Sequence, residues 1–175
     1  SVDEQGNLLY SGAPGTGGFS DVKRGDWYAP YVTFAKRYGI ANGYLDGTFR
    51  PEQPVSRAEL VKLIASYFTV EGGTSPFPDV PDGHWAAEVV SFAAEEGWVS
   101  GYPDGTFRPD APVSRAEAVK ILNHALDRRA GERAAALPFT DVEKGHWACD
   151  EIREAAVSHI YRKSGEGETW LTYER

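Results

Sequence analysis

The chain has 175 residues and a net charge of −8, with 26 acidic against 18 basic side chains. This balance argues against a general nucleic-acid binder, because such proteins need clustered basic side chains to replace the counterions of phosphate. No apolar run reaches the roughly 18 residues of a membrane-spanning helix, so no membrane span is expected. The single cysteine, Cys149, excludes an intrachain disulfide.

Residues 1–18 are predicted to be a flexible lead-in, because they end in a glycine-rich stretch and such segments behave as flexible chains. We expect an upstream domain of a larger protein to be covalently attached to them.

After residue 18 the chain repeats itself. A Phe-x-Asp-Val motif begins at Phe19, Phe77 and Phe139, and a tryptophan follows each at the same spacing. The repeats predict three segments, residues 19–76, 77–138 and 139–175.

Each of the first two copies predicts a helix, a turn-rich loop and a second helix. In copy two, apolar positions recur with helical spacing from Trp85 until Gly97, and an Asp-Gly turn follows. The second helix begins at a capping box, Ser-x-x-Glu, in which both side chains satisfy backbone N–H groups. The capping residues are Ser56, Glu59, Ser114 and Glu117. One such helix pair cannot bury its apolar face alone, so the copies are expected to pack together.

The third copy departs from this pattern after Ile160. It contains neither the Asp-Gly-Thr-Phe loop nor the Arg-Ala-Glu helix start of the other two. Two interpretations stay open: the tail is a specialised end-cap, or this copy has diverged. Both weaken the prediction of a third, equivalent binding groove.

Arg57 and Arg115 each occupy the first helical position after a capping serine. A helix N-terminus carries about half a positive charge and presents backbone N–H groups, and a guanidinium adds donors that match a carboxylate. These positions predict a local anion site on an otherwise acidic chain. The alternative is an intramolecular ion pair, for example from Arg57 to Glu59 or to an acid of the neighbouring copy.

The repeated tryptophans have two possible roles. Each begins the apolar stripe of a predicted helix, which favours a place in the core for Trp27, Trp85 and Trp147. The alternative is a groove wall on which a sugar ring packs. Trp85 and Trp147 are better placed for that role, since each follows a copy with an Arg-Ala-Glu helix.

The Asp-Gly dipeptides predict turns and not metal loops, because a calcium loop needs several more oxygen ligands.

Together these motifs resemble the S-layer homology family. The resemblance rests on the Phe-x-Asp-Val start, the tryptophan, the Gly-Tyr-x-Asp-Gly-Thr-Phe-x-Pro loop and a Thr-Arg-Ala-Glu signature, here Ser-Arg-Ala-Glu. It covers residues 19–126 closely and residues 139–160 more loosely. It implies a mainly α fold in which three helix–loop–helix repeats pack as a pseudo-threefold helical bundle with short extended loops.

The resemblance also implies a function. Modules of this family anchor proteins non-covalently to the bacterial cell wall, so we expect a non-catalytic, extracellular module at the cell surface without a cofactor or a metal. The ligand would be a secondary cell-wall polysaccharide with acidic pyruvate ketals, bound in grooves between repeats. The expected ligand-binding residues are Arg57, Arg115, Trp85 and Trp147. Alternatives are modified peptidoglycan and a protein–protein or S-layer lattice interaction. A glycosidase with paired carboxylates is disfavoured, because the acids recur with the repeats as scaffolding residues do.

Overall fold

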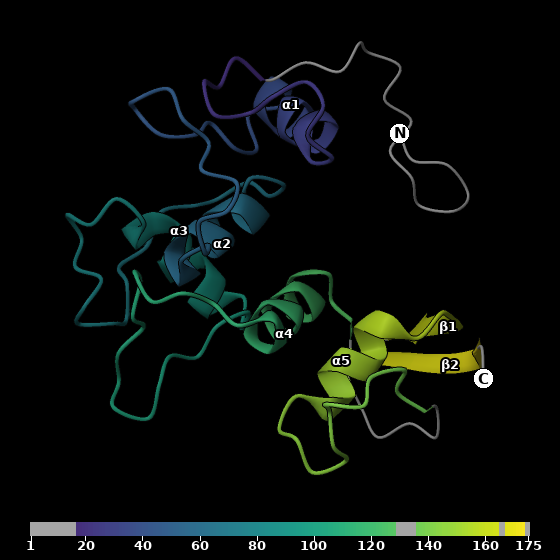
Figure 1. Cartoon of the computed structure of the whole chain (residues 1–175). Helices are drawn as coiled ribbons and strands as arrows, with labels where there is room; N and C mark the ends of the chain where they lie inside the picture. Colours follow the sequence, from purple (N-terminus) through teal and green to yellow (C-terminus); the bar gives the residue numbers. More distant parts are fainter. Residues whose placement is uncertain (1–16, 129–135, 165–166, 174–175) are drawn as a thin grey trace. The chain divides into compact units, whose positions relative to one another are not determined.

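The computed structural model describes residues 17–128, 136–164 and 167–173. Within them the chain is mainly helical, as the sequence predicts, with five helices and one two-stranded sheet (Figure 1). The predicted lead-in lies almost entirely outside the described residues. The chain forms two compact units, Ser1–Pro54 and Val55–Arg175. The boundary falls inside the first repeat and places its two helices in different units.

The first unit contains helix α1, Ala29–Arg37, and the Asp-Gly loop that follows it. Two basic side chains in the last turn of this helix, Lys36 and Arg37, interact favourably with the negative end of the helix dipole. A small core joins the Phe-x-Asp-Val motif to the helix and the loop. Its members are Phe19, Val22, Ala29 and Val32, with Phe49 packed against them.

The second unit contains the other four helices: α2, Arg57–Ala65; α3, Ala87–Glu95; α4, Arg115–Ala125; and α5, Cys149–Ala156. Helix α2 packs against α3 and α4, and α4 packs against α5 (Figure 1). The core shared by α2, α3 and α4 consists mainly of alanine and branched apolar side chains, together with Phe77 and Phe107. Phe107 belongs to the Asp-Gly-Thr-Phe loop and is fully buried, so this loop is anchored in the core.

Both capping boxes are present at the starts of α2 and α4. The Ser56 hydroxyl accepts the N–H of Glu59 at 3.2 Å, and the Glu59 carboxylate accepts the N–H of Ser56 at 2.8 Å. Ser114 and Glu117 form the same two bonds, at 3.2 and 2.9 Å. These bonds satisfy backbone donors that have no partner inside the helix, which stabilises each helix start by about 1 kcal/mol.

In the first two copies the aspartate of the Phe-x-Asp-Val motif joins that motif to the loop of its own copy. The Asp79 carboxylate accepts the N–H groups of Phe107 and Arg108 at 2.9 and 2.7 Å, and Asp21 holds the first copy's loop in the same way. Burial opposes the charge of Asp79, but the two N–H donors outweigh it and hold the pKa of Asp79 below its usual value. Arg108 has φ 59°, a left-handed conformation that costs a non-glycine residue about 1–2 kcal/mol. The two hydrogen bonds offset this cost.

The third copy continues from α5 into a hairpin. Strand β1, His159–Ser164, pairs antiparallel with strand β2, Gly167–Tyr173 (Figure 1). The hairpin takes the place of the Asp-Gly-Thr-Phe loop and the second helix, so the predicted helix–loop–helix form is wrong for this copy. The reason is local, since β2 is rich in β-branched and aromatic residues and β1 contains Ile160 and Tyr161, and such residues favour strand over helix. The pseudo-threefold arrangement of the copies stays a prediction.

Gly101 opens the Asp-Gly loop of the second copy and offers a test of how closely that loop packs against Phe77. Gly101 has φ +69°, and an added Cβ would lie 2.5 Å from Cε1 of Phe77 and 3.0 Å from the carbonyl oxygen of Thr106. Gly105 has φ +80° with nothing within 4 Å of such a Cβ. We expect Gly105→Ala to lower the free energy of unfolding by about 1–2 kcal/mol from backbone strain alone. Gly101→Ala should cost about 1–3 kcal/mol more, because Phe77 is buried and cannot move aside freely.

Urea unfolding followed by circular dichroism measures both losses, and Gly105→Ala is the matched control for backbone strain. Equal losses in the two variants would contradict the close approach of Phe77 to Gly101.

Candidate functional site

A groove of about 490 Å³ lies in the second unit, and residues from all three copies line it. We call this site the groove. The main contributors are Arg57 of α2, the segment 97–102 after α3, the capping residue Ser114 before α4, Glu117 and Lys120 of α4, and Trp147 just before α5. Glu117 and Lys120 lie three residues apart on α4 and therefore share one face of that helix.

Arg57 lines the groove, but its side chain is only 8% exposed. Its Nε donates to the carbonyl oxygen of Phe107 at 3.0 Å, and its Nη1 donates to Oε1 of Glu117 at 3.1 Å. The guanidinium also lies over the ring of Tyr102, 4.9 Å from the ring centroid. The ion pair to an acid of the neighbouring copy, which the sequence leaves open as an alternative, is therefore present for Arg57.

Carbonyl groups of the second copy accept the backbone N–H groups at the start of α2. The N–H of Arg57 donates to the carbonyl of Ala111, and the N–H of Ala58 donates to the carbonyl of Pro109, both at 3.0 Å. The next N–H, that of Glu59, is used by the capping serine. The sequence-based expectation of free backbone donors at this helix start is wrong, because the loop before α4 supplies acceptors that only the folded chain brings there.

Glu117 is the acidic partner in the groove. In addition to Arg57, it receives hydrogen bonds from the hydroxyl of Tyr102 at 2.9 Å and from Ser114. Burial opposes its charge, but the bonds from Ser114 and Tyr102 and the charge of Arg57 outweigh burial and lower the pKa of Glu117. Glu117 therefore stays ionised at neutral pH and balances the charge of Arg57.

Arg115 has different surroundings from Arg57, although the two residues are equivalent in sequence. It is exposed at the first position of α4 and does not line the groove. With the residues that the structure describes, it forms neither a hydrogen bond nor an ion pair. The loop that covers Arg57 comes from the following copy, and the copy that follows Arg115 has a hairpin in place of that loop. The two arginines are thus not brought together in one site.

The repeated tryptophans are on the surface. Trp27, Trp85 and Trp147 are 80%, 53% and 60% exposed, so the expectation that they belong to the core is wrong. The cause is a difference of register. The helix after Trp85 begins only at Ala87, so the tryptophan lies in the preceding turn and not on the buried face of the helix. Trp147 lines the groove, whereas Trp85 lies beneath the ammonium of Lys62, 5.2 Å from its ring centroid.

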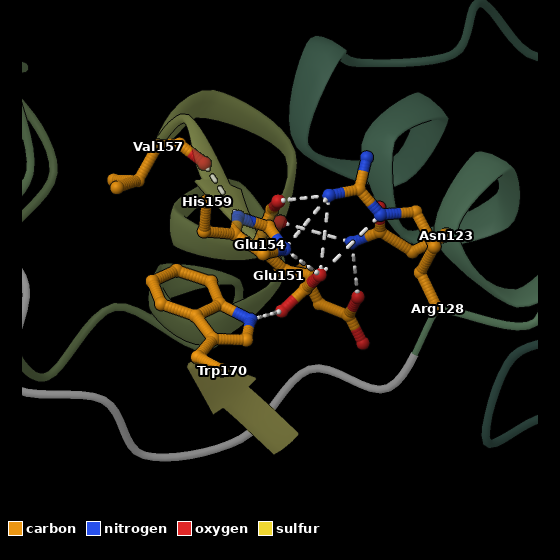
Figure 2. A network of polar contacts seen from close by, with 7 residues as sticks. All are labelled: Asn123, Arg128, Glu151, Glu154, Val157, His159 and Trp170. Atoms are coloured by element: carbon orange, nitrogen blue, oxygen red, sulfur yellow. Dashed lines mark hydrogen bonds and ion pairs between the residues drawn. The ribbon is translucent and has the colours of Figure 1, made fainter. Parts of the chain in front are cut away.

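A second polar cluster holds the hairpin of the third copy (Figure 2). Its centre is Glu154 on α5, which is 1% exposed. The Glu154 carboxylate receives the indole N–H of Trp170 at 3.0 Å and pairs with Arg128 and His159, both at 3.2 Å. His159 and Trp170 also stack, with ring centroids 3.8 Å apart. The cluster therefore ties both strands and the end of α4 to one buried carboxylate.

Sequence reasoning did not single out Tyr102, Lys120 or the Glu154 cluster. A signal existed for the first two, because a Gly-Tyr pair and a lysine five positions after the signature arginine occur in both complete copies. The cluster had no such signal, since its members come from the third copy and from the end of α4, outside the repeated motifs.

The comparisons with known proteins agree with the repeat pattern of the first two copies. The sequence profile of the S-layer homology domain matches residues 18–61 and 76–119. The chain is 34% identical to Cell surface glycoprotein 1 of Acetivibrio thermocellus over 91% of its own length, and 35% identical to Cellulosome-anchoring protein of the same organism over 86%. It is 40% identical to the S-layer protein of Bacillus licheniformis over 61%.

The chain spans only a part of each of these relatives, namely 7%, 35% and 13% of their respective lengths. No helix within the described residues has both the length and the apolar character needed to cross a membrane. In that same part of the chain, no three His, Cys, Asp or Glu side chains are grouped as metal ligands would be.

Proposed function

Because the chain belongs to the S-layer homology family, we propose that it anchors a larger protein to the bacterial cell wall by binding an acidic wall polysaccharide in the groove. It works at the cell surface as a binding module and not as an enzyme. One observation supports the proposal: the exposed ring of Trp147 and the lysine Lys120 line the same groove, on a chain whose net charge is −8. A flat aromatic face and a local positive charge are the features that an acidic sugar needs.

The acidic group that we propose is a pyruvate ketal, which places one compact carboxylate on each modified sugar. The negative net charge repels polyanions at long range, so attraction has to come from contacts shorter than the Debye length of about 8–10 Å. Arg115 and Trp85 stay predicted ligand contacts. Neither of them lines the groove, so we assign the principal binding to the side of the groove formed by Trp147.

Co-sedimentation with purified bacterial cell walls tests this function. We expect the protein to sediment with intact walls and to stay in solution when mild acid has removed the pyruvate ketals. Trp147→Ala should weaken the binding to intact walls about tenfold or more, since truncating a central aromatic contact commonly costs above 1 kcal/mol. Trp27→Ala is the matched control, because Trp27 occupies the same repeat position but lies in the first unit.

Unchanged sedimentation after ketal removal would exclude the ketal as the recognised group and favour modified peptidoglycan. Binding to purified surface-layer protein in the absence of any glycan would favour the lattice interaction.

A further inference from the structure

The positive charge of Arg57 is balanced by an acidic side chain of the protein itself. Arg57 is paired with Glu117 and bonded to the carbonyl of Phe107. A ligand carboxylate that bound Arg57 in place of Glu117 would leave the Glu117 carboxylate partly buried without its cation, which is strongly unfavourable. Ser114 and Tyr102 also hold that carboxylate where it is. Arg57 is therefore poorly suited to be the groove's contact for an anion.

Lys120 differs from Arg57 in its surroundings. It lies on α4 three residues after Glu117, lines the groove and is partly exposed. With residues 17–128, 136–164 and 167–173 it forms neither a hydrogen bond nor an ion pair. His124 also lines the groove, but its ring nitrogens contact the carbonyl of Gly97 and the carboxylate of Glu151. Lys120 is thus the cation of the groove whose charge no described acid balances.

The first copy supplies an independent observation. Lys62 on α2 occupies the repeat position of Lys120, and its ammonium lies over the ring of Trp85 in the next copy. The lysine of one copy therefore reaches the tryptophan of the following copy. Lys120 and Trp147 have the same relation in sequence, and both line the groove. The groove therefore offers an acidic sugar both an aromatic ring, Trp147, and an ammonium group, Lys120.

We propose that Lys120, and not Arg57, binds the carboxylate of the groove's ligand, while Trp147 packs on the sugar ring. The proposal rests on the proposed function and deepens it by naming the residue that binds the carboxylate of the acidic sugar. Arg57 then has a positioning role. It fixes Glu117 and Tyr102 and so shapes the wall of the groove without contacting the ligand.

Titration calorimetry with two small probes tests this assignment. The first probe is a methyl hexoside with a 4,6-linked pyruvate ketal, and the second is its methyl ester, which has nearly the same shape but no charge. We expect Lys120→Gln to weaken binding of the acid about tenfold, the size of one charge-assisted hydrogen bond, and to leave binding of the ester unchanged. Lys120→Arg should keep most of the affinity. Lys23→Gln, the same change at an exposed lysine of the first unit, should have no effect on either probe.

Equal binding of the acid by the wild type and by Lys120→Gln would overturn the role of Lys120 and leave the proposed function standing. A parallel loss of the acid and the ester in Lys120→Gln would also overturn it, because the lysine would then act through shape and not charge. If the wild type bound neither probe and no cell walls, the proposed function and this assignment would fail together.

Discussion

Glu154→Ala is expected to lower the free energy of unfolding by about 3–5 kcal/mol, the range for removing one member of a buried ion pair. The carboxylate is almost fully buried and is shared by Arg128, His159 and the indole of Trp170 (Figure 2). Its loss removes the carboxylate that pairs with the guanidinium and accepts the indole N–H, and it leaves a cavity beside α5. Because both strands of the hairpin are tied to this one side chain, we expect the hairpin to be the part that loses order first.

Urea unfolding followed by circular dichroism measures the loss, and hydrogen exchange of the strand amides locates it. Glu88→Ala provides the control, because Glu88 is an exposed acid on α3 and surface substitutions usually change stability by less than about 0.5 kcal/mol. A loss in Glu154→Ala no larger than in Glu88→Ala would contradict the central place of Glu154.

Arg57→Ala should lower the free energy of unfolding by about 2–4 kcal/mol, somewhat less than for a fully buried pair because water still reaches Glu117. The change removes the ion pair, the bond to the Phe107 carbonyl and the packing of the guanidinium on Tyr102. Arg115→Ala, at the equivalent position of the next copy, should change it by less than about 0.5 kcal/mol because Arg115 is exposed.

The same urea unfolding measurement separates the two arginines. A double-mutant cycle with Glu117→Ala isolates the pair, and the double variant should be less destabilised than the sum of the two single changes. Equal stability of Arg57→Ala and Arg115→Ala would show that the two signature arginines have the same surroundings, against the structure.

The features that the sequence predicts well are local. A capping box needs only a serine and a glutamate three residues apart, so Ser56 and Glu59 could be placed at a helix start without any knowledge of the packing. The turns at the Asp-Gly dipeptides are local in the same way, since the Asp104 carboxylate accepts the N–H of Thr106 two residues later.

The features that it predicts poorly depend on which copy follows. Arg57 and Arg115 stand in nearly identical sequence, yet one is covered by a loop of the next copy and the other is exposed. No local pattern could distinguish them. The tryptophans are mispredicted for another reason: the helical spacing includes Trp85, but α3 begins two residues later, at Ala87. In the third copy the β-branched and aromatic residues of β1 and β2 were a usable signal for strands.

The boundaries of the sequence repeats differ from those of the compact units, and this difference decides which segment can be grafted onto another protein. By sequence, α2 belongs to the first copy, but it packs on α3 and α4 and joins their core. A graft divided in the glycine-containing stretch 70–76 would carry α3 and α4 without the helix that covers them. A division between Pro54 and Val55 leaves both cores whole, so the repeated unit of the sequence and the compact unit of the fold differ by one helix.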